Sequence, residues 1–230
     1  MNKVIVITGG FGTLGVAVGR RFATDGWHVA LIDRAPTPAG ETASEFSAQL
    51  LLGGVDLTDL GAAQSTLGAV VAHFGGIDAL INVAGGFRFE TVGDSDLATW
   101  DFMYQVNLRT AVTASKAALE HLTKRGGGRI VNIAAGAAVK AASGMGAYAA
   151  SKAGVMRLTE ALADELKDRG ITVNAILPSI IDTPQNRKDM PRADFTRWVA
   201  PPAIADVIFF LASGGARAVT GALIPVTGRS

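Results

Sequence analysis

The chain of 230 residues contains no cysteine. This absence excludes disulfide bonds, thiolate metal sites and cysteine nucleophiles. Histidine is also scarce, since only His28, His73 and His121 are present and they lie far apart in the sequence. We therefore expect each histidine to be a packed or surface residue, and we expect no metal site.

A strong charge of one sign and a long hydrophobic run are absent as well. The 21 basic and 20 acidic side chains give a formal net charge of +1, and no dense cluster of Lys and Arg occurs. We expect no nucleic-acid partner and no membrane partner. The apolar start at residues 3–7 is too short for a signal peptide, and no run reaches the ~20 residues that span a bilayer. These features predict a soluble, cytoplasmic protein that acts on a small molecule.

Short apolar runs alternate with longer segments of helical periodicity, which is typical of βαβ units in an α/β fold. Most runs lack a strict polar–apolar alternation, so they predict strands that are buried on both faces of a parallel sheet. One helix is predicted from Leu60 to Phe74 and ends at Gly75. No repeat or linker divides the chain, so residues 1–230 are predicted to form one domain, in which residues 35–48 are the most loop-like part of the first half. The predicted strands are residues 3–7, 28–32, 49–55, 78–84, 128–134, 171–177 and 222–226.

The segment TGGFGTLG directly follows the first predicted strand, and its Gly10, Gly12 and Gly15 form a G-x-G-x-x-G pattern. Glycines at these positions permit a tight turn and close approach of a pyrophosphate to a helix N-terminus. Asp33 ends the second predicted strand, 18 residues after Gly15, where a carboxylate can bind the ribose hydroxyls of NAD. NAD(H) is therefore the preferred cofactor, although the neighbouring Arg34 leaves NADP(H) possible.

Tyr148 and Lys152 are one helical turn apart in the segment YAASK, among alanines and glycines. An unperturbed tyrosine has a pKa of ~10, and a nearby ammonium group is expected to lower it. Tyr148 is therefore a candidate proton donor and acceptor during hydride transfer, with Lys152 tuning its pKa. For an isolated Y-x-x-x-K pattern, a core tyrosine beside an exposed lysine would be the better interpretation.

These segments together resemble the short-chain dehydrogenase/reductase family. The resemblance rests also on VDLTD at 55–59, NVAG at 82–85, Asn107 in VNL, and LPSIIDTP at 177–184. It implies a single-domain Rossmann fold, which is a doubly wound parallel sheet of about seven strands with helices on both faces. It also implies that Asn107 is a third catalytic residue, which anchors a water between Lys152 and solvent. The cofactor-binding residues that it implies are Gly9, Gly10, Gly12, Thr13, Leu14, Gly15, Asp33, Arg34, Asp56, Leu57, Asn82, Ala84, Gly85, Tyr148, Lys152, Pro178, Ile181 and Thr183.

The sequence departs from the family pattern most clearly at Ala135, because members usually have a serine thirteen residues before the tyrosine. Thr13 and Ser179 also replace usual glycines. Three interpretations remain open for Ala135. The chain is a dinucleotide-binding regulator without catalysis, or Ser143 substitutes for the missing hydroxyl, or the substrate does not need it.

The third interpretation is supported by a resemblance to the dihydropteridine reductase branch of the family, which works without this serine, uses NADH and reduces a quinonoid dihydropterin. The resemblance runs over residues 177–198 and is densest in residues 182–198, and it implies a substrate lid at about 182–200. Asn82 and Asn107 instead follow the broad family, so a carbonyl or 3-oxoacyl reductase, or an alcohol dehydrogenase, stays an alternative. The candidate substrate residues are Ala135, Ser143, Asn186, Met190 and Trp198, although the lid side chains could simply pack on the core.

The predicted helix from Tyr148 to Arg169 carries small and apolar residues on more than one side. Such a helix indicates burial against another subunit as well as against the sheet. We therefore expect a homodimer or homotetramer, as is usual in the family. Burial within one large domain would also account for the pattern.

Overall fold

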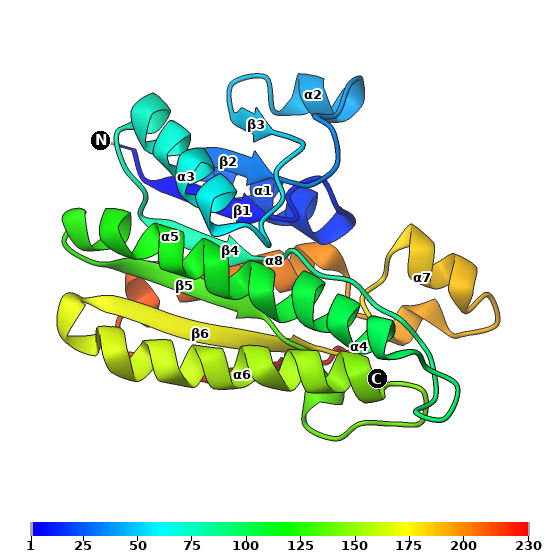
Figure 1. Ribbon diagram of the computed structural model, residues 1–230. Helices are drawn as coiled ribbons and strands as arrows, with labels where there is room; N and C mark the ends of the chain where they lie inside the picture. Colours follow the sequence, from blue (N-terminus) through cyan, green and yellow to red (C-terminus); the bar gives the residue numbers. More distant parts are fainter. Residues whose placement is uncertain (1, 230) are drawn as a thin grey trace.

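The computed structural model describes residues 2–229 and contains one parallel sheet (Figure 1). Seven strands form it, in the order β3-β2-β1-β4-β5-β6-β7. Chain order therefore reverses between β1 and β4, and each half of the sheet is wound outward from this point. The strands are β1 (Val4–Thr8), β2 (His28–Ile32), β3 (Leu50–Leu52), β4 (Ala79–Asn82), β5 (Gly128–Ile133), β6 (Ile171–Pro178) and β7 (Leu223–Val226).

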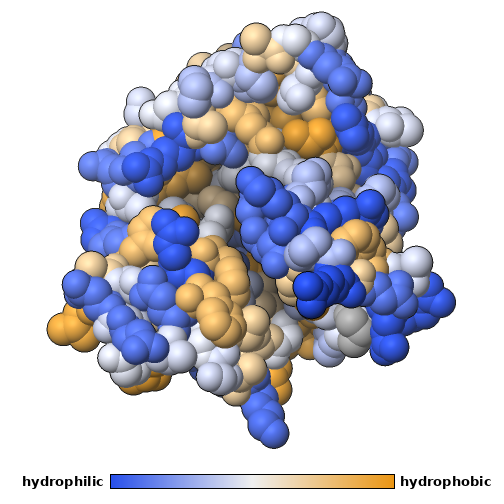
Figure 2. Space-filling model, turned by 90° about the vertical axis from the view of Figure 1, so that its right-hand side faces the viewer, coloured by the Kyte–Doolittle hydropathy of each residue, from blue (hydrophilic) through white to orange (hydrophobic). Residues whose placement is uncertain are grey.

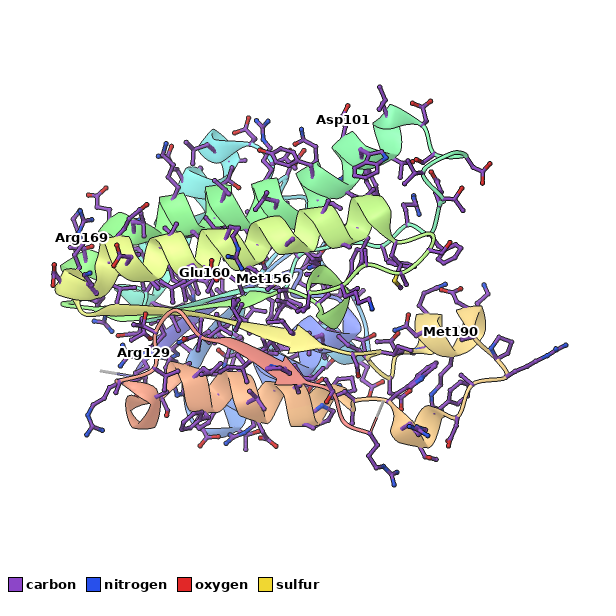
Figure 3. The ribbon with its side chains drawn as sticks, turned by 90° about the horizontal axis from the view of Figure 1, so that it is seen from below. Asp101, Arg129, Met156, Glu160, Arg169 and Met190 are labelled. Atoms are coloured by element: carbon purple, nitrogen blue, oxygen red, sulfur yellow. The ribbon has the colours of Figure 1, made fainter. Side chains whose placement is uncertain are left out.

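Helices cover both faces of the sheet, as Figures 1 and 3 show. On one face α1 (Thr13–Thr24) packs against α8 (Pro201–Ala212), and their apolar residues share a core with Ile5, Ile7 and Leu31. On the other face lie α3 (Leu60–Phe74), α5 (Thr110–Lys124) and α6 (Gly146–Leu166), over Val4, Val6 and other residues of alternate register. The predicted doubly wound, single-domain Rossmann fold is confirmed.

The ends of α3 show how local sequence sets a boundary. The carboxylate of Asp59 accepts a hydrogen bond from the Ala62 amide at 2.8 Å, which satisfies one free donor of the first turn. Gly75 ends the helix with a φ of 85°, a conformation that suits glycine. The helix predicted from the apolar spacing is thus present with its predicted end.

Two segments add to the expected elements. Residues 35–48, the most loop-like part of the first half, include the short helix α2 (Glu41–Glu45). The helix α4 (Leu97–Met103) continues into α5 through a π-helical turn, η1 (Tyr104–Arg109), which holds Asn107. Short one-turn segments complete the chain: η2 (Gly136–Ala138), η3 (Lys167–Arg169), α7 (Pro184–Asp189), η4 (Phe195–Arg197) and η5 (Gly214–Ala216). Among residues 2–229, no helix is long and apolar enough to cross a membrane.

Candidate active site

A cleft of about 400 Å³ opens beside the carboxyl ends of β1 and β4. In an open α/β sheet this is where the strand order reverses and where the loops that follow adjacent strands diverge. Figure 2 looks onto this end of the molecule and shows a hollow bordered by hydrophobic and hydrophilic surface. The predicted cofactor residues that line the cleft are Gly9, Gly12, Thr13, Leu14, Gly15, Asp33, Arg34, Asp56, Leu57, Ala84, Gly85 and Thr183.

The glycine-rich loop between β1 and α1 is compact because its backbone segments approach one another closely. Gly9 has a φ of 62°, and a Cβ there would lie 2.8 Å from the backbone of Ala84 in the loop after β4. A Cβ at Gly15 would collide with the carbonyl oxygen of Gly9. Side chains at either position would therefore push the first turn of α1 away from the sheet.

The N-terminus of α1 faces the cleft. Its N-cap is Gly12, no side chain caps the helix, and its first turn holds no acidic residue. Backbone N–H groups and the positive end of the helix dipole are therefore available to an anionic group, as a pyrophosphate requires.

Asp33 stands directly after β2 with its carboxylate held by two backbone amides. Its Oδ2 accepts a hydrogen bond from the Phe11 amide at 3.0 Å, and its Oδ1 accepts one from the Ala35 amide at 2.9 Å. These bonds fix the carboxylate at the cleft wall while each oxygen keeps a free lone pair. Asp56 lies along the same wall, and hydrogen bonds from Thr58 lower the pKa of its carboxyl, with a smaller contribution from the nearby Arg34 cation.

Two predicted cofactor residues instead support the fold. Gly10 is buried, and a Cβ there would lie 2.7 Å from the Leu31 Cβ, so this glycine lets the loop pack on β2. Asn82 is 3% exposed, and its Nδ2 donates to Ser115 Oγ at 3.0 Å and to Asn132 Oδ1 at 2.8 Å. Asn82 lies outside the cleft lining, and its side-chain amide joins β4 to α5 and β5, so its role in lining the cofactor stays a prediction.

Pro178 and Ile181 also lie outside the cleft lining. Pro178 ends the buried strand β6, and Ile181 forms an isolated parallel bridge with Val199. Thr183 does line the cleft, where its hydroxyl also caps α7 by accepting the Asn186 amide at 3.1 Å. This segment therefore meets the cleft through Thr183 and Gln185.

Asn107 and Lys152 meet the wall of the cleft at Gly85. An added Cβ on Gly85 would lie 2.7 Å from Asn107 Oδ1 and 3.3 Å from Lys152 Nζ, so only glycine permits this approach. Lys152 is 5% exposed, and its Nζ donates to the carbonyl oxygen of Ile133 at 2.7 Å. The catalytic lysine of the prediction is thus a buried ammonium group beside the cofactor cleft.

Burial sets the protonation of the Tyr148–Lys152 pair. Desolvation raises the pKa of Tyr148 to about 12 and lowers the pKa of Lys152 to about 8. The expectation that Lys152 lowers the pKa of Tyr148 is therefore wrong for this structure, because the Tyr148 shift comes from desolvation, which favours the neutral phenol. At neutral pH Tyr148 is a phenol ready to donate a proton, and Lys152 is mainly cationic.

The surroundings of Tyr148 are apolar. Ala134 and Ala135 are 2% and 5% exposed at the end of β5, and neither brings a hydroxyl group. Phe87, in the loop after β4, packs edge-on against the Tyr148 ring with centroids 4.9 Å apart. Phe87 was not among the predicted site residues, although its position directly after the NVAGG segment was a usable signal.

The other candidate substrate residues are dispersed. Ser143 is exposed in the loop before α6, and the Asn186 Nδ2 donates to the Ile181 carbonyl at 2.8 Å. Met190 follows α7, at the same end of the molecule as the first turn of α6 (Figure 3). Trp198 is 8% exposed and contacts Phe195, with ring centroids 4.7 Å apart. Trp198 is therefore a packed residue of this segment.

The cleft also contains residues that were not predicted individually. Val55, Thr58 and Val83 lie within the quoted segments VDLTD and NVAG, and Gln185 lies within the predicted lid. The others come from α4, η1 and α5, because these helices run along the cleft although they are distant in sequence from the glycine-rich loop. They are Phe102, Gln105, Val106 and Thr110.

The residues present fit a dinucleotide. The glycine loop leaves space that Cβ atoms would fill, the N-terminus of α1 is uncapped, and the Asp33 carboxylate is fixed at the cleft wall. Together these features match the pyrophosphate and ribose ends of such a ligand.

Comparison with known proteins agrees with this geometry. Residues 3–193 match the family model described as short chain dehydrogenase. The chain is 34% identical to a D-threitol dehydrogenase from Mycolicibacterium smegmatis, over 99% of this chain and 92% of the relative. It is 32% identical to a 7alpha-hydroxysteroid dehydrogenase from Bacteroides fragilis, over 99% of this chain and 93% of the relative. The chain therefore belongs to the short-chain dehydrogenase/reductase family and is an NAD(P)-dependent oxidoreductase.

Solved structures share the fold. A short-chain type dehydrogenase/reductase from Mycobacterium ulcerans aligns with a TM-score of 0.90 at 24% identity, covering 99% of this chain and 89% of the other. The structure of ElxO with NADP bound aligns with a TM-score of 0.88 at 26% identity, covering 99% and 98%. The seven-stranded architecture is thus that of the family over nearly the whole chain.

The buried ammonium group of Lys152 predicts a specific pH dependence of stability. Its pKa is lower in the folded state than in the unfolded chain, so the unfolded chain binds more protons between about pH 8 and pH 10.5. In wild type, Lys152 therefore costs about 3 kcal/mol of unfolding free energy below pH 8, and this cost disappears as pH rises to 10.5.

We expect the unfolding free energy of wild type, relative to Lys152→Met, to rise across this pH range in urea titrations. The titration of Tyr148 is common to both proteins and cancels in the difference. Lys140→Met, which removes an exposed lysine, serves as the control and should give a flat difference. A flat difference for Lys152→Met as well would contradict the buried-cation assignment.

Proposed function

We propose that this protein is an NADH-dependent reductase in which Tyr148 is the only side-chain proton donor at the reacting atom, and that its substrate is a quinonoid dihydropteridine. The observation that carries the proposal is the protonated Tyr148 in an apolar site whose usual serine position is Ala135. The resemblance of residues 177–198 to the dihydropteridine reductase branch supports the same substrate class.

The glycine-rich loop and Asp33 would hold NADH, and the bound cofactor would supply the hydride that the substrate ring accepts. Tyr148 donates its phenol proton to a ring nitrogen, so the substrate gains two electrons and two hydrogens. The Lys152 cation stabilises the phenolate that remains, and a pKa of about 8 lets Lys152 pass a proton onward near neutral pH. The ammonium group also lies beside Gly85 of the cleft wall, where it is close to the cofactor position.

The missing serine restricts which substrates react well. Loss of one donor to a developing oxyanion costs about 10²–10³ in rate. A quinonoid ring is conjugated and electron-poor, so it accepts hydride without a second donor. Phe87 is 47% exposed and packs against the Tyr148 ring, and Phe89 is 65% exposed and lies beside Gly144 in the loop before α6. Such exposed aromatic rings suit contact with a planar substrate ring.

Tyr148→Phe should remove catalysis and leave cofactor binding nearly intact, because it deletes only the transferable proton. We expect a loss of at least about 10² in turnover of quinonoid dihydropterin generated in the cuvette. NADH oxidation reports the turnover, and NADH fluorescence titration reports the binding. Undiminished turnover in this variant would overturn the proposal.

A carbonyl reductase or alcohol dehydrogenase is a second candidate, because the relatives described above are named as dehydrogenases of threitol and of a hydroxysteroid. Under this alternative the site lacks a donor that a ketone needs. Ala135→Ser should then raise the turnover of a 3-oxo ester by about tenfold or more, while wild type turns over the ester faster than the pterin. An unchanged ester rate would count against this candidate.

We also propose a preference for NAD over NADP, based on the fixed carboxylate of Asp33. A 2′-phosphate placed at this carboxylate would meet like charge. We expect Asp33→Ser to lower the ratio of kcat/KM for NADH to that for NADPH by about tenfold or more. Arg34 is exposed beside Asp33 and should favour NADPH in this variant, so Asp33→Ser/Arg34→Ala provides the control. A ratio unaffected by Asp33→Ser would show that the preference is set elsewhere.

A further inference from the structure

We propose that Ser151 is a positioning residue, whose buried hydroxyl holds the turn of α6 that carries Tyr148 at a fixed place relative to the cofactor cleft. This inference rests on the proposed role of Tyr148. Ser151 is 5% exposed, and neither the cofactor cleft nor the proton transfer uses its side chain directly.

One hydroxyl joins two structural elements. Ser151 Oγ accepts a hydrogen bond from Asn107 Nδ2 at 3.0 Å and donates one to the carbonyl oxygen of Tyr148 at 2.7 Å. The acceptor is the backbone of the catalytic residue itself. Ser151 thus connects the π-helical turn η1 to the first turns of α6.

Asn107 extends this connection to the cleft. It is 1% exposed, its Nδ2 also donates to the Gly86 carbonyl at 3.0 Å, and its Oδ1 accepts the Gly86 amide at 3.0 Å. Gly86 directly follows Gly85, which lines the cleft. A continuous series of hydrogen bonds therefore runs from the cleft wall through Asn107 and Ser151 to Tyr148.

Close helix packing makes so short a connection possible. An added Cβ on Gly154, one turn beyond Ser151, would lie 2.5 Å from Leu108 Cδ2 of η1. Gly154 therefore leaves room for the Leu108 side chain, and η1 packs closely enough on α6 for the Ser151 hydroxyl to reach Asn107. A π-helical turn places its residues out of the regular helical register, and such turns are frequent at functional sites.

Removal of the Ser151 hydroxyl should affect the turn that carries Tyr148 and leave the cleft wall unchanged. Asn107 Nδ2 keeps its bond to Gly86 but loses its partner on α6, so the cleft wall stays intact while the turn of Tyr148 is released from it. We therefore expect proton transfer to suffer and NADH binding to be preserved. Small displacements of a reacting group can cost on the order of 10²-fold in rate.

The structure offers a matched control in Ser115. This serine is 1% exposed and its Oγ accepts from the buried amide of Asn82 at 3.0 Å, so Ser115→Ala removes the same type of asparagine–serine bond. Ser115 has no bond to α6 among the described hydrogen bonds of residues 2–229. Both substitutions should lower the free energy of unfolding by similar amounts. Only Ser151→Ala should change the position of Tyr148 relative to the cleft.

The experiment compares wild type, Ser151→Ala, Ser151→Thr and Ser115→Ala in NADH oxidation with quinonoid dihydropterin, NADH fluorescence titration and urea unfolding. We expect Ser151→Ala to lower kcat by about tenfold or more while the Kd for NADH changes by less than about threefold. Ser151→Thr should recover most of kcat, because a threonine hydroxyl in a helix also bonds the carbonyl three or four residues earlier. Ser115→Ala should keep kcat.

An equal loss of kcat in Ser151→Ala and Ser115→Ala, or no loss in Ser151→Ala, would overturn the inference. The comparison of these two alanine variants tests the role of Ser151 even if the Ser151→Thr variant does not fold. Tyr148→Phe run in parallel separates the two proposals. Full activity in Tyr148→Phe would refute the role of Tyr148, whereas an inactive Tyr148→Phe with a fully active Ser151→Ala would refute only the role of Ser151.

Discussion

The ammonium group of Lys152 is buried against the end of β5, where it donates to the Ile133 carbonyl. The surrounding structure depends on accommodating this cation. Gly85 must lack a side chain for Nζ to reach the cleft wall, and α6 must lie close along the sheet. A buried cation lowers stability, so its retention beside Tyr148 is best understood as a requirement of the chemistry.

The same packing accounts for the protonation of the Tyr148 side chain. Its ring contacts Phe87 and its pKa is raised by desolvation, so the phenol is protonated at neutral pH. In the proposed reaction this phenol gives its proton to a substrate atom. Ala134 and Ala135 after β5 bring no hydroxyl group, so the proposed substrate would react with a single donor.

Fold and cofactor cleft could be predicted well because they depend on backbone geometry. The apolar runs predicted β1, β2, β4, β5 and β6 to within a few residues, since strands buried on both faces need continuous apolar sequence. The run at 222–226 predicted β7 as well, although β7 is only partly buried. The glycine motif and Asp33 predicted one side of the cleft, because both are placed by the backbone at the ends of β1 and β2. The opposite side, with Phe102 and Gln105, could not be predicted, because helices distant in sequence supply it.

Individual side chains were harder to assign. Asn82 and Gly10 lie within motifs that accompany the cofactor. In the structure, however, the Asn82 amide donates a hydrogen bond to Ser115, and Gly10 packs closely against Leu31. The direction of the Tyr148 pKa shift also depends on burial, which sequence spacing does not report.

By itself, the sequence determined the order of strands and helices, the glycine-rich turn and the Tyr148–Lys152 pair, because these follow from local periodicity and backbone freedom. Tertiary structure alone decided the protonation of that pair, the packing of Phe87 on Tyr148 and the bonds from Gly86 through Asn107 to Ser151. Each of these depends on desolvation or on contacts between elements distant in the chain.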